Sequence, residues 1–412
     1  MQHGAVLRKL MHACAAASLV VTSTAVVGIG AAAAKDITVG VLVPLTGELG
    51  RFGEIVASGF DLALDEINAA GGTKCGNLRF VVDDTRGQPD HALRAASKMI
   101  DTDKAVAIIG PSSSEMVALV DLAKRKKVVL ASSIAGSITL NKLGGDFVYR
   151  TVSSDLGDGI AAGLWLSERG YKRVAFLVQN EESTISTAQA ARARVEAAGI
   201  AITDYVVFNS NQPSYQAELV SVLANQPDAI YLAGGQVSGV TVIKEASVGG
   251  FEGQWLLSAD LAVPETFGAV GADLLNGRAF VEFADADNSF PEFKAFREKY
   301  LAKTKNEPGP FASNSYDLVN LVALALEASG DCTGNGINAA IRNVSEGGEP
   351  VTTFAEGKAA LAQGKDIDLV GASGSLTFDK SGTVSGAYTI QGAKDGAWVT
   401  EKFYPASTFE QK

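Results

Sequence analysis

Short apolar runs and helix-like stretches alternate through residues 37–131. The run 37–43 is apolar and rich in β-branched residues, which predicts a buried strand. After a turn, apolar side chains recur at helical spacing from Phe52 to Ile67, and glycines end that predicted helix. Further strands are expected at 78–82, 105–109 and 127–131, and further helices at 89–100 and 114–124. This βαβαβαβ order predicts a parallel sheet covered by helices.

A second unit of the same kind follows after residue 151. Its predicted helices are 155–169, 187–198, 214–224 and 237–248, and its predicted strands are 173–178, 203–208, 229–232 and 254–257. The pattern then changes to a strand at 277–283, long helices at 291–303 and 313–327, two shorter helices and a hairpin-like tail at 375–404. No low-complexity linker separates the units, so two lobes joined by several chain crossings are expected.

The first 34 residues have the pattern of an export signal. Arg8 and Lys9 form a short basic start, 10–27 is almost wholly apolar or small, and four alanines ending at Ala34 offer a cleavage pattern. Cleavage is expected near Ala34. The alternatives are an uncleaved membrane anchor and a lipoprotein modified at Cys14, whose preceding residues make a poor lipobox. No later segment has the ~20 apolar residues of a membrane span, so the mature protein is expected to be soluble and outside the cytoplasm.

Charge and composition exclude several classes of protein. The 412 residues include 35 basic and 46 acidic ones, for a net charge of −11, which argues against binding nucleic acid or an anionic membrane surface. Beyond residue 34 the only cysteines are Cys75 and Cys332 and the only histidine is His91, too few for an ordinary zinc site. No metal or cofactor is therefore expected. Outside the cytoplasm the two cysteines either pair or remain two free thiols.

Two polar loops follow neighbouring predicted strands. The loop Gly110-Pro111-Ser112-Ser113-Ser114 joins a strand to a helix, and its hydroxyls and helix-start N–H groups could hold a carboxylate. The alternative is simple N-capping by one serine. The loop 132–137 adds hydroxyls after the next strand, at the edge of the sheet where ligands of open α/β sheets gather. A glycine series at Gly47, Gly50 and Gly53 lacks the dinucleotide-binding spacing.

Several motifs together resemble the periplasmic leucine/isoleucine/valine-binding proteins. They are 36–40, 44–47, Phe52-Gly53, 65–72, Asp83-Asp84, 109–114, 149–151 with Asp155 and Gly159, and 371–379 with Gly382. Each motif is weak alone, but their order and spacing are specific and cover nearly all of the mature chain.

The resemblance implies an α/β type I periplasmic binding fold, with two Rossmann-like lobes and three crossings that form a hinge. The implied lobes are 35–151 plus 282–372 and 152–281 plus 373–412. Such proteins bind a small ligand, here an amino acid or a related carboxylate or amide, in the cleft and deliver it to an ABC permease. A monomer is expected.

The resemblance also implies where the ligand binds. The ligand carboxylate is expected on Ser113, Ser114 and the turn formed by Ile134, Ala135, Gly136 and Ser137. Phe52 is expected to line the pocket and Asp260 to bind the ammonium group.

The chain departs from the family in the second lobe, where 180–184 replaces a usual Tyr-Gly pair. A usual tyrosine is also replaced near Gly235 and Gln236, so Ser183 and Gly235 are expected to leave room for a bulkier ligand. The resemblance places both cysteine segments in the first lobe, and we predict that Cys75 and Cys332 are bonded.

Two other functions use the same sequence features. An exported ligand sensor would have the same fold, and no residue separates it from a transport protein. A secreted hydrolase would use Ser113 or Ser114 with His91, although no nucleophile-elbow motif surrounds these serines.

Overall fold

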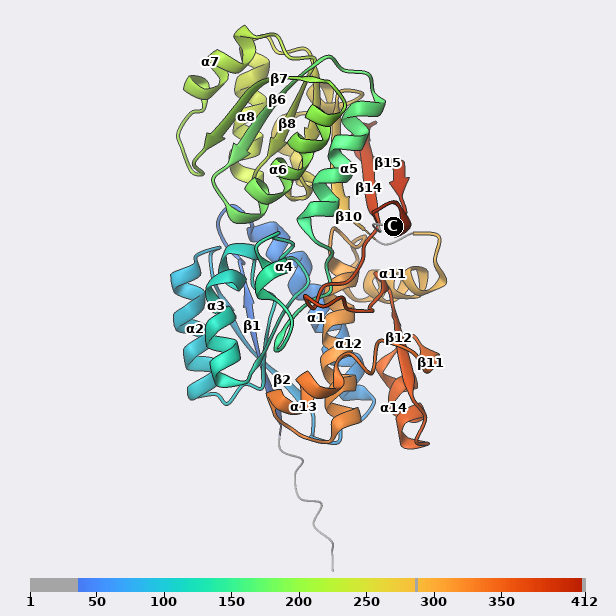
Figure 1. The fold of residues 1–412 in the computed structure, drawn as a ribbon. Coiled ribbons are helices and arrows are strands. Elements are labelled where there is room, and N and C mark those ends of the chain that lie inside the picture. Colours follow the sequence, from blue (N-terminus) through green and yellow to red (C-terminus); the bar gives the residue numbers. More distant parts are fainter. Residues whose placement is uncertain (1–35, 286–287, 410–412) are drawn as a thin grey trace, which may run out of the picture. The chain divides into compact units, whose positions relative to one another are not determined.

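The computed structural model describes residues 36–285 and 288–409 (Figure 1). Residues 1–34, with the predicted export signal, the cleavage position near Ala34 and Cys14, lie outside the described residues. Among the helices that are described, none combines the length and the apolar character needed to cross a bilayer.

The first sheet has five parallel strands in the order β2-β1-β3-β4-β5. Its elements are β1 (Ile37–Val43), α1 (Gly50–Ala69), β2 (Leu78–Asp84), α2 (Pro89–Asp101), β3 (Ala107–Ile109), α3 (Ser113–Lys126), β4 (Val129–Ser132), α4 (Leu140–Leu143) and β5 (Val148–Arg150). The predicted βαβαβαβ order is confirmed. The short α4 and β5 were not predicted, because three or four residues carry too little periodicity.

Every residue of β1 is buried because helices cover both faces of the sheet. Val39, Val41 and Val43 pack into the core that α1 shares with α12 (Ala312–Ser329). Leu42 points to the opposite face and packs into the core with α2 and α3. The strand β1 is therefore apolar along nearly its whole length because both of its faces pack against helices.

The second sheet has seven strands in the order β15-β14-β10-β9-β8-β6-β7. Strands β6 to β10 are parallel, and β14 and β15 form an antiparallel hairpin at the edge. Its elements are α5 (Asp155–Glu168), β6 (Arg173–Gln179), α6 (Glu182–Ala197), β7 (Ala201–Phe208), α7 (Gln216–Ala224), β8 (Ala229–Ala233), α8 (Gln236–Val248), β9 (Gln254–Leu257), the 3-10 turn Ala259–Leu261, α9 (Glu265–Val270), α10 (Ala272–Leu275), β10 (Ala279–Ala284), β14 (Tyr388–Lys394) and β15 (Ala397–Tyr404).

Late segments of the chain complete the first sheet's layers. They are α11 (Pro291–Thr304), α12, α13 (Gly334–Ala340), β11 (Glu349–Val351), α14 (Phe354–Ala362), β12 (Ile367–Gly371) and β13 (Gly374–Ser375). Strands β11, β12 and β13 form a small sheet of their own. Helix α12 is buried on nearly all sides, although it carries several polar residues among its apolar ones. Buried polar groups need hydrogen-bond partners inside the protein. The buried Asp317 of α12 accepts hydrogen bonds from the N–H groups of Ala372 and Ser373, at 2.9 and 2.7 Å.

The chain passes between the two large sheets three times. It leaves the first sheet between β5 and α5, returns between β10 and α11, and leaves again between β13 and β14. The predicted lobe boundary at residue 282 falls inside β10, which pairs with β9 and β14 of the second sheet.

Cys75 and Cys332 form a disulfide with an S–S distance of 2.06 Å, so the predicted pairing is confirmed. The bond joins the turn after α1 to the turn after α12. Nearby, the backbone N–H of Lys74 donates to the carboxylate of Glu327 on α12, at 2.7 Å.

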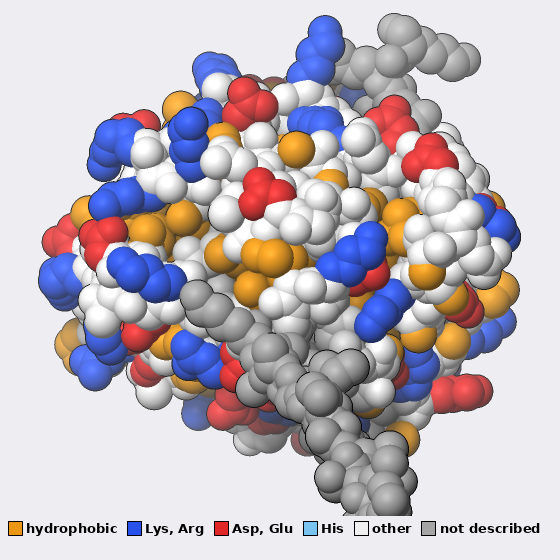
Figure 2. All heavy atoms as spheres, turned by 90° about the horizontal axis from the view of Figure 1, so that it is seen from below, with side chains coloured by type: hydrophobic (Ala, Val, Ile, Leu, Met, Phe, Trp, Pro, Cys, Tyr) orange, Lys and Arg blue, Asp and Glu red, His pale blue; other side chains and the backbone are white. Residues whose placement is uncertain are grey.

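The surface seen from below carries both signs of charge. Figure 2 shows Lys and Arg side chains interspersed with Asp and Glu over the described part of this face. The basic run 124–127 forms the end of α3, where Lys126 pairs with Asp101 at 2.7 Å. Basic side chains at a helix C-terminus are favoured by the helix dipole, so the run has a structural role.

Candidate functional site

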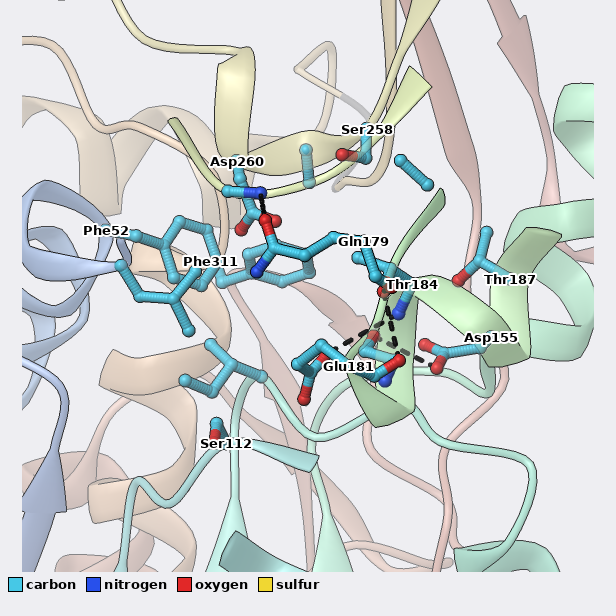
Figure 3. Close-up of a pocket in the computed structure, with 16 residues that line it drawn as sticks. Phe52, Ser112, Asp155, Gln179, Glu181, Thr184, Thr187, Ser258, Asp260 and Phe311 are labelled. Carbon is cyan, nitrogen blue, oxygen red and sulfur yellow. Dashed lines mark hydrogen bonds between the residues drawn. The ribbon is translucent and has the colours of Figure 1, made fainter. Parts of the chain in front are cut away.

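A cavity of about 90 Å³ lies where loops at the carboxyl ends of strands from both large sheets meet (Figure 3). Open α/β sheets bind ligands at this edge. The loop after β1, the start of α3 and the turn after β4 contribute from the first sheet. The lining residues are Leu49, Phe52, Ser112, Ile134, Asp155, Gln179, Glu181, Ser183, Thr184, Thr187, Ala233, Gly235, Ser258, Ala259, Asp260 and Phe311.

Three acids line the cavity: Asp155 at the start of α5, Glu181 before α6, and Asp260 after β9. None of the lining residues described is Lys, Arg or His. The cavity therefore gathers acidic side chains without a basic side chain at its wall.

Asp260 is the acid with the fewest compensating contacts. No hydrogen bond or ion pair joins its carboxylate to another described residue. Burial, followed by the nearby carboxylates of Glu181 and Glu48, raises the pKa of Asp260 to about 7. Its charged form is thus disfavoured, since burial and neighbouring negative charges both favour the neutral form of a carboxyl group.

Asp155 is held against the turn after β4. Its backbone N–H donates to Gly136 O at 2.7 Å, and the Ser183 hydroxyl donates to its carboxylate at 3.1 Å. A Cβ atom at Gly136 would lie 1.9 Å from Asp155 Oδ1. Burial, and then the charge of Asp158, raise the pKa of Asp155 well above its usual range. The carboxylate thus occupies the space that a side chain at position 136 would fill.

Glu181 caps helix α6. Its carboxylate accepts hydrogen bonds from the N–H groups of Ser183 and Thr184, at 2.8 and 3.4 Å. Burial raises the pKa of Glu181, and these backbone donors and the Ser114 side chain oppose that rise. A carboxylate at a helix N-terminus is stabilised by the helix dipole, so Glu181 shapes the cavity and also stabilises α6.

The donors of the two polar loops are largely used inside the protein. Ser113 Oγ accepts from the Ser137 N–H at 3.3 Å. The hydroxyl of Ser132 accepts from the N–H groups of Ile134 and Ala135, at 3.1 and 3.0 Å. Ser137 Oγ donates to Glu182 at 2.7 Å. Ser112 Oγ, on the cavity wall, is the exception, since it is buried without a described partner. The other hydroxyls named here support the two loops rather than face the cavity.

Two phenylalanines form an apolar wall. The rings of Phe52 and Phe311 lie with centroids 5.3 Å apart in an edge-on arrangement (Figure 3). Phe52 is on α1 and Phe311 precedes α12, far along the chain. Opposite them, Gln179 Oε1 accepts from the Gly235 N–H at 2.9 Å.

Five of the predicted ligand-binding residues line the cavity, and six do not. On the wall are Phe52, Ile134, Ser183, Gly235 and Asp260. Off the wall are Ser113, Ser114, Ala135, Gly136, Ser137 and Gln236. Their roles in binding stay predictions.

Sequence reasoning missed several wall residues. Asp155 was a family landmark without an assigned role, and Glu181 stood in the segment that departs from the family. Gln179, Thr187 and Ser258 carried no signal beyond their place near the ends of predicted elements. Phe311 reaches the cavity only because of tertiary folding, which no local pattern reveals.

The arrangement that the alternative of a secreted hydrolase would need is not present among the described residues. His91 Nε2 lies 3.0 Å from Asp83 Oδ1. Among the described hydrogen bonds, none joins His91 to Ser113 or Ser114. The described residues also contain no group of three His, Cys, Asp or Glu side chains placed to hold a metal ion.

Two α/β sheets whose strand ends share one small cavity define a protein built to bind a solute. The chain belongs to the periplasmic binding protein family, which it matches over residues 36–396. The resemblance to leucine/isoleucine/valine-binding proteins is confirmed, and membership implies an extracytoplasmic protein whose relatives bind solutes rather than catalyse reactions.

Its relatives include a Leu/Ile/Val-binding protein, BraC3, of Rhizobium johnstonii. The two are 26% identical over 371 residues, which span 89% of this chain and 94% of the relative. A Leu/Ile/Val-binding protein homologue of Brucella melitensis is 24% identical over 89% of this chain and 93% of its own length.

Solved structures confirm the type I periplasmic binding fold. The leucine-binding protein LivK of Thermotoga maritima is similar with a TM-score of 0.79 and 23% identity, over 90% of this chain and 99% of that one. LivJ of Streptococcus pneumoniae, solved with isoleucine, is similar with a TM-score of 0.77 and 23% identity, over 90% of this chain and 99% of that one. A solute-binding protein of R. palustris, solved with benzoate, is similar with a TM-score of 0.75 and 19% identity, over 90% of this chain and 97% of that one.

Proposed function

We propose that this chain is the extracytoplasmic substrate-binding protein of an ABC importer and carries a small amino acid-like ligand in the cavity between its two large sheets. The observation that supports this most directly is the unpaired carboxylate of Asp260 on the wall of a small cavity at the strand ends. Such a carboxylate is suited to an ammonium group, because the charge-assisted hydrogen bond would be shielded from water.

The ligand binds through groups from both lobes. Phe52, Ile134 and Ser112 face it from the first lobe, and Ser183, Gly235 and Asp260 from the second. Ser113, Ser114, Ala135, Gly136, Ser137 and Gln236 act behind this wall by fixing the loops. The named relatives bind branched-chain amino acids or benzoate, so this family adapts one cleft to different solutes.

Binding closes a hinge between the two predicted lobes, 35–151 plus 282–372 and 152–281 plus 373–412. Since β10 pairs within the second sheet and β13 pairs with β12, the boundaries near 282 and 373 move to the ends of β10 and β13. Several contacts already join segments from the two sides. Glu48, after β1, accepts hydrogen bonds from the N–H and hydroxyl of Ser238 on α8, and Arg51 donates to Glu265 at 2.8 Å. Three strand crossings permit rotation while preventing separation of the lobes.

The remaining assignments complete the proposal. The protein acts in the periplasm as a monomer after removal of residues 1–34 near Ala34, delivers its ligand to an inner-membrane permease, and is not an enzyme. It needs no cofactor and binds no nucleic acid.

A thermal-shift screen tests the function. Ligand that binds only the folded state raises the melting temperature by mass action. The panel contains amino acids, amides, aromatic acids, dipeptides and small amines. A melting temperature that no compound raises would contradict the proposed function.

A further inference from the structure

We propose that the cavity selects a small organic cation with net positive charge, such as a basic amino acid or a diamine, over neutral amino acids and carboxylate anions. This inference rests on the proposed function and narrows its substrate class.

The first argument is the charge around the cavity. Asp155, Glu181 and Asp260 line it, while no lining residue among those described is basic. The buried guanidinium of Arg150 is not on the wall: it donates to Ser137 O at 3.1 Å and to Asn141 Oδ1 at 2.6 Å. Its positive charge only partly opposes the rise in the pKa of Asp155, which burial and Asp158 keep well above the usual range. Among the ion pairs of the described residues, none includes a cavity carboxylate.

The second argument is that the three acids differ in how far the protein satisfies them. Glu181 accepts two helix-start N–H groups and Asp155 accepts the Ser183 hydroxyl. Asp260 accepts no described hydrogen bond, and Glu181, Glu48 and Asp158 all act on it as negative charges. A ligand cation removes this repulsion, whereas a ligand anion adds to it.

The third argument is that the cavity wall offers few hydrogen-bond donors for an anionic group on the ligand. A carboxylate on the ligand would need donors from the two polar loops. Ser113 Oγ and Ser132 Oγ instead accept N–H groups of the turn after β4, and those N–H groups are thereby used. Of the residues in these two loops, only Ser112 and Ile134 line the cavity. The Ser112 hydroxyl is buried without a described partner and is the one side-chain donor that the loops leave on the wall, so an anion would gain few hydrogen bonds in return for losing its water.

The fourth argument is the aromatic wall. Phe52 and Phe311 contact the same cavity as Asp260. An alkyl chain packs against such rings, and aromatic faces attract ammonium groups. Carboxylates on one side and aromatic rings on the other suit an alkyl ammonium better than a free carboxylate.

Calorimetry and thermal shift on the mature protein test the inference. The probes are lysine, arginine and 1,4-diaminobutane as cations, leucine as a neutral zwitterion, and benzoate as an anion. We expect at least one cation to bind and leucine and benzoate to bind at least tenfold more weakly. In Asp260→Asn, which keeps the side-chain shape, cation affinity should fall at least tenfold. The matched control, Asp273→Asn on exposed α10, should leave it unchanged.

A second measurement needs no variant. A cation that ionises Asp260 on binding displaces its proton, so the binding enthalpy near pH 6.5 should change with the ionisation enthalpy of the buffer in the direction of proton release. Leucine or benzoate binding without any cation binding would overturn the inference and leave the proposed function intact. Failure of every probe and of the wider screen would overturn both.

Discussion

At the scale of single residues, Asp260 couples the site to the stability of the protein. Its pKa is raised to about 7 by burial and by Glu181 and Glu48, against about 3.9 in an unfolded chain. The folded state therefore holds a proton that the unfolded state has lost between these two values. The free energy of unfolding must fall as pH rises through this window.

Asp260→Asn should remove part of that fall. We expect the free energy of unfolding at pH 8 to rise by roughly 1–3 kcal/mol in the variant, with little change at pH 4. Urea denaturation of ligand-free protein from pH 4 to 8 measures this, with Asp273→Asn as the control. Parallel pH curves for the variant and the native protein would show that Asp260 ionises freely.

The carboxylate of Asp155 leaves room only for glycine at position 136. A Cβ atom there would lie 1.9 Å from Asp155 Oδ1, so Gly136→Ala should displace that carboxylate from Ser183. We expect a loss of about 1–3 kcal/mol of stability and weaker binding, because overpacking forces neighbours to move. Gly268→Ala on α9 is the control, since a Cβ there meets nothing within 4 Å. Unchanged melting and affinity in Gly136→Ala would contradict the close packing.

At the scale of elements, the start of α8 is held from the opposite side of the cavity. Glu48 accepts from the N–H and hydroxyl of Ser238, and its side chain lies where a Cβ at Gly235 would be. A carboxylate at a helix N-terminus gains from the helix dipole as well as from the hydrogen bonds. In the proposed hinge motion this contact would favour closure, and a side chain larger than glycine at position 235 would meet Glu48.

Glu48→Ala should therefore shift the hinge toward an open form. We expect ligand affinity to fall by roughly 1–2 kcal/mol, with the loss appearing as faster dissociation. Stopped-flow kinetics and small-angle scattering with and without ligand measure the change. Glu298→Gln, exposed on α11, serves as the control. An unchanged dissociation rate would mean that Glu48 contributes nothing to closure.

The helices and strands were largely predictable from the sequence, and the contacts between loops were less so. The apolar run of β1 and the periodic helix α1 stand out because burial on one or both faces leaves a pattern in the sequence. For the site, the sequence indicated Phe52 and Asp260 as wall residues. It could not show that the hydroxyl oxygens of Ser113 and Ser132 accept hydrogen bonds from neighbouring backbone N–H groups, because those bonds depend on how the two loops fold against each other.

At the scale of the whole molecule, one covalent bond joins distant parts of the first lobe. The cysteines are 257 residues apart in sequence. Replacing both by serine should lower the free energy of unfolding by about 2–5 kcal/mol, since a long loop in the unfolded chain is no longer closed. Denaturant titration measures this, and reductant should have no further effect on the variant. Equal stability of the variant and the oxidised protein would exclude a stabilising role.

The position of α12 has a consequence for how the protein is made. This helix contributes much of the first lobe's core, facing α1 and β1, although the second-lobe segment from α5 to β10, about 130 residues, is synthesised before it. Until α12 leaves the ribosome, the apolar face of α1 has no cover and the first lobe has no complete interior. Vectorial synthesis therefore delays folding until the chain is nearly finished. A delay of this kind keeps the first lobe unfolded for longer, and an unfolded chain is the state that a secretion channel can thread.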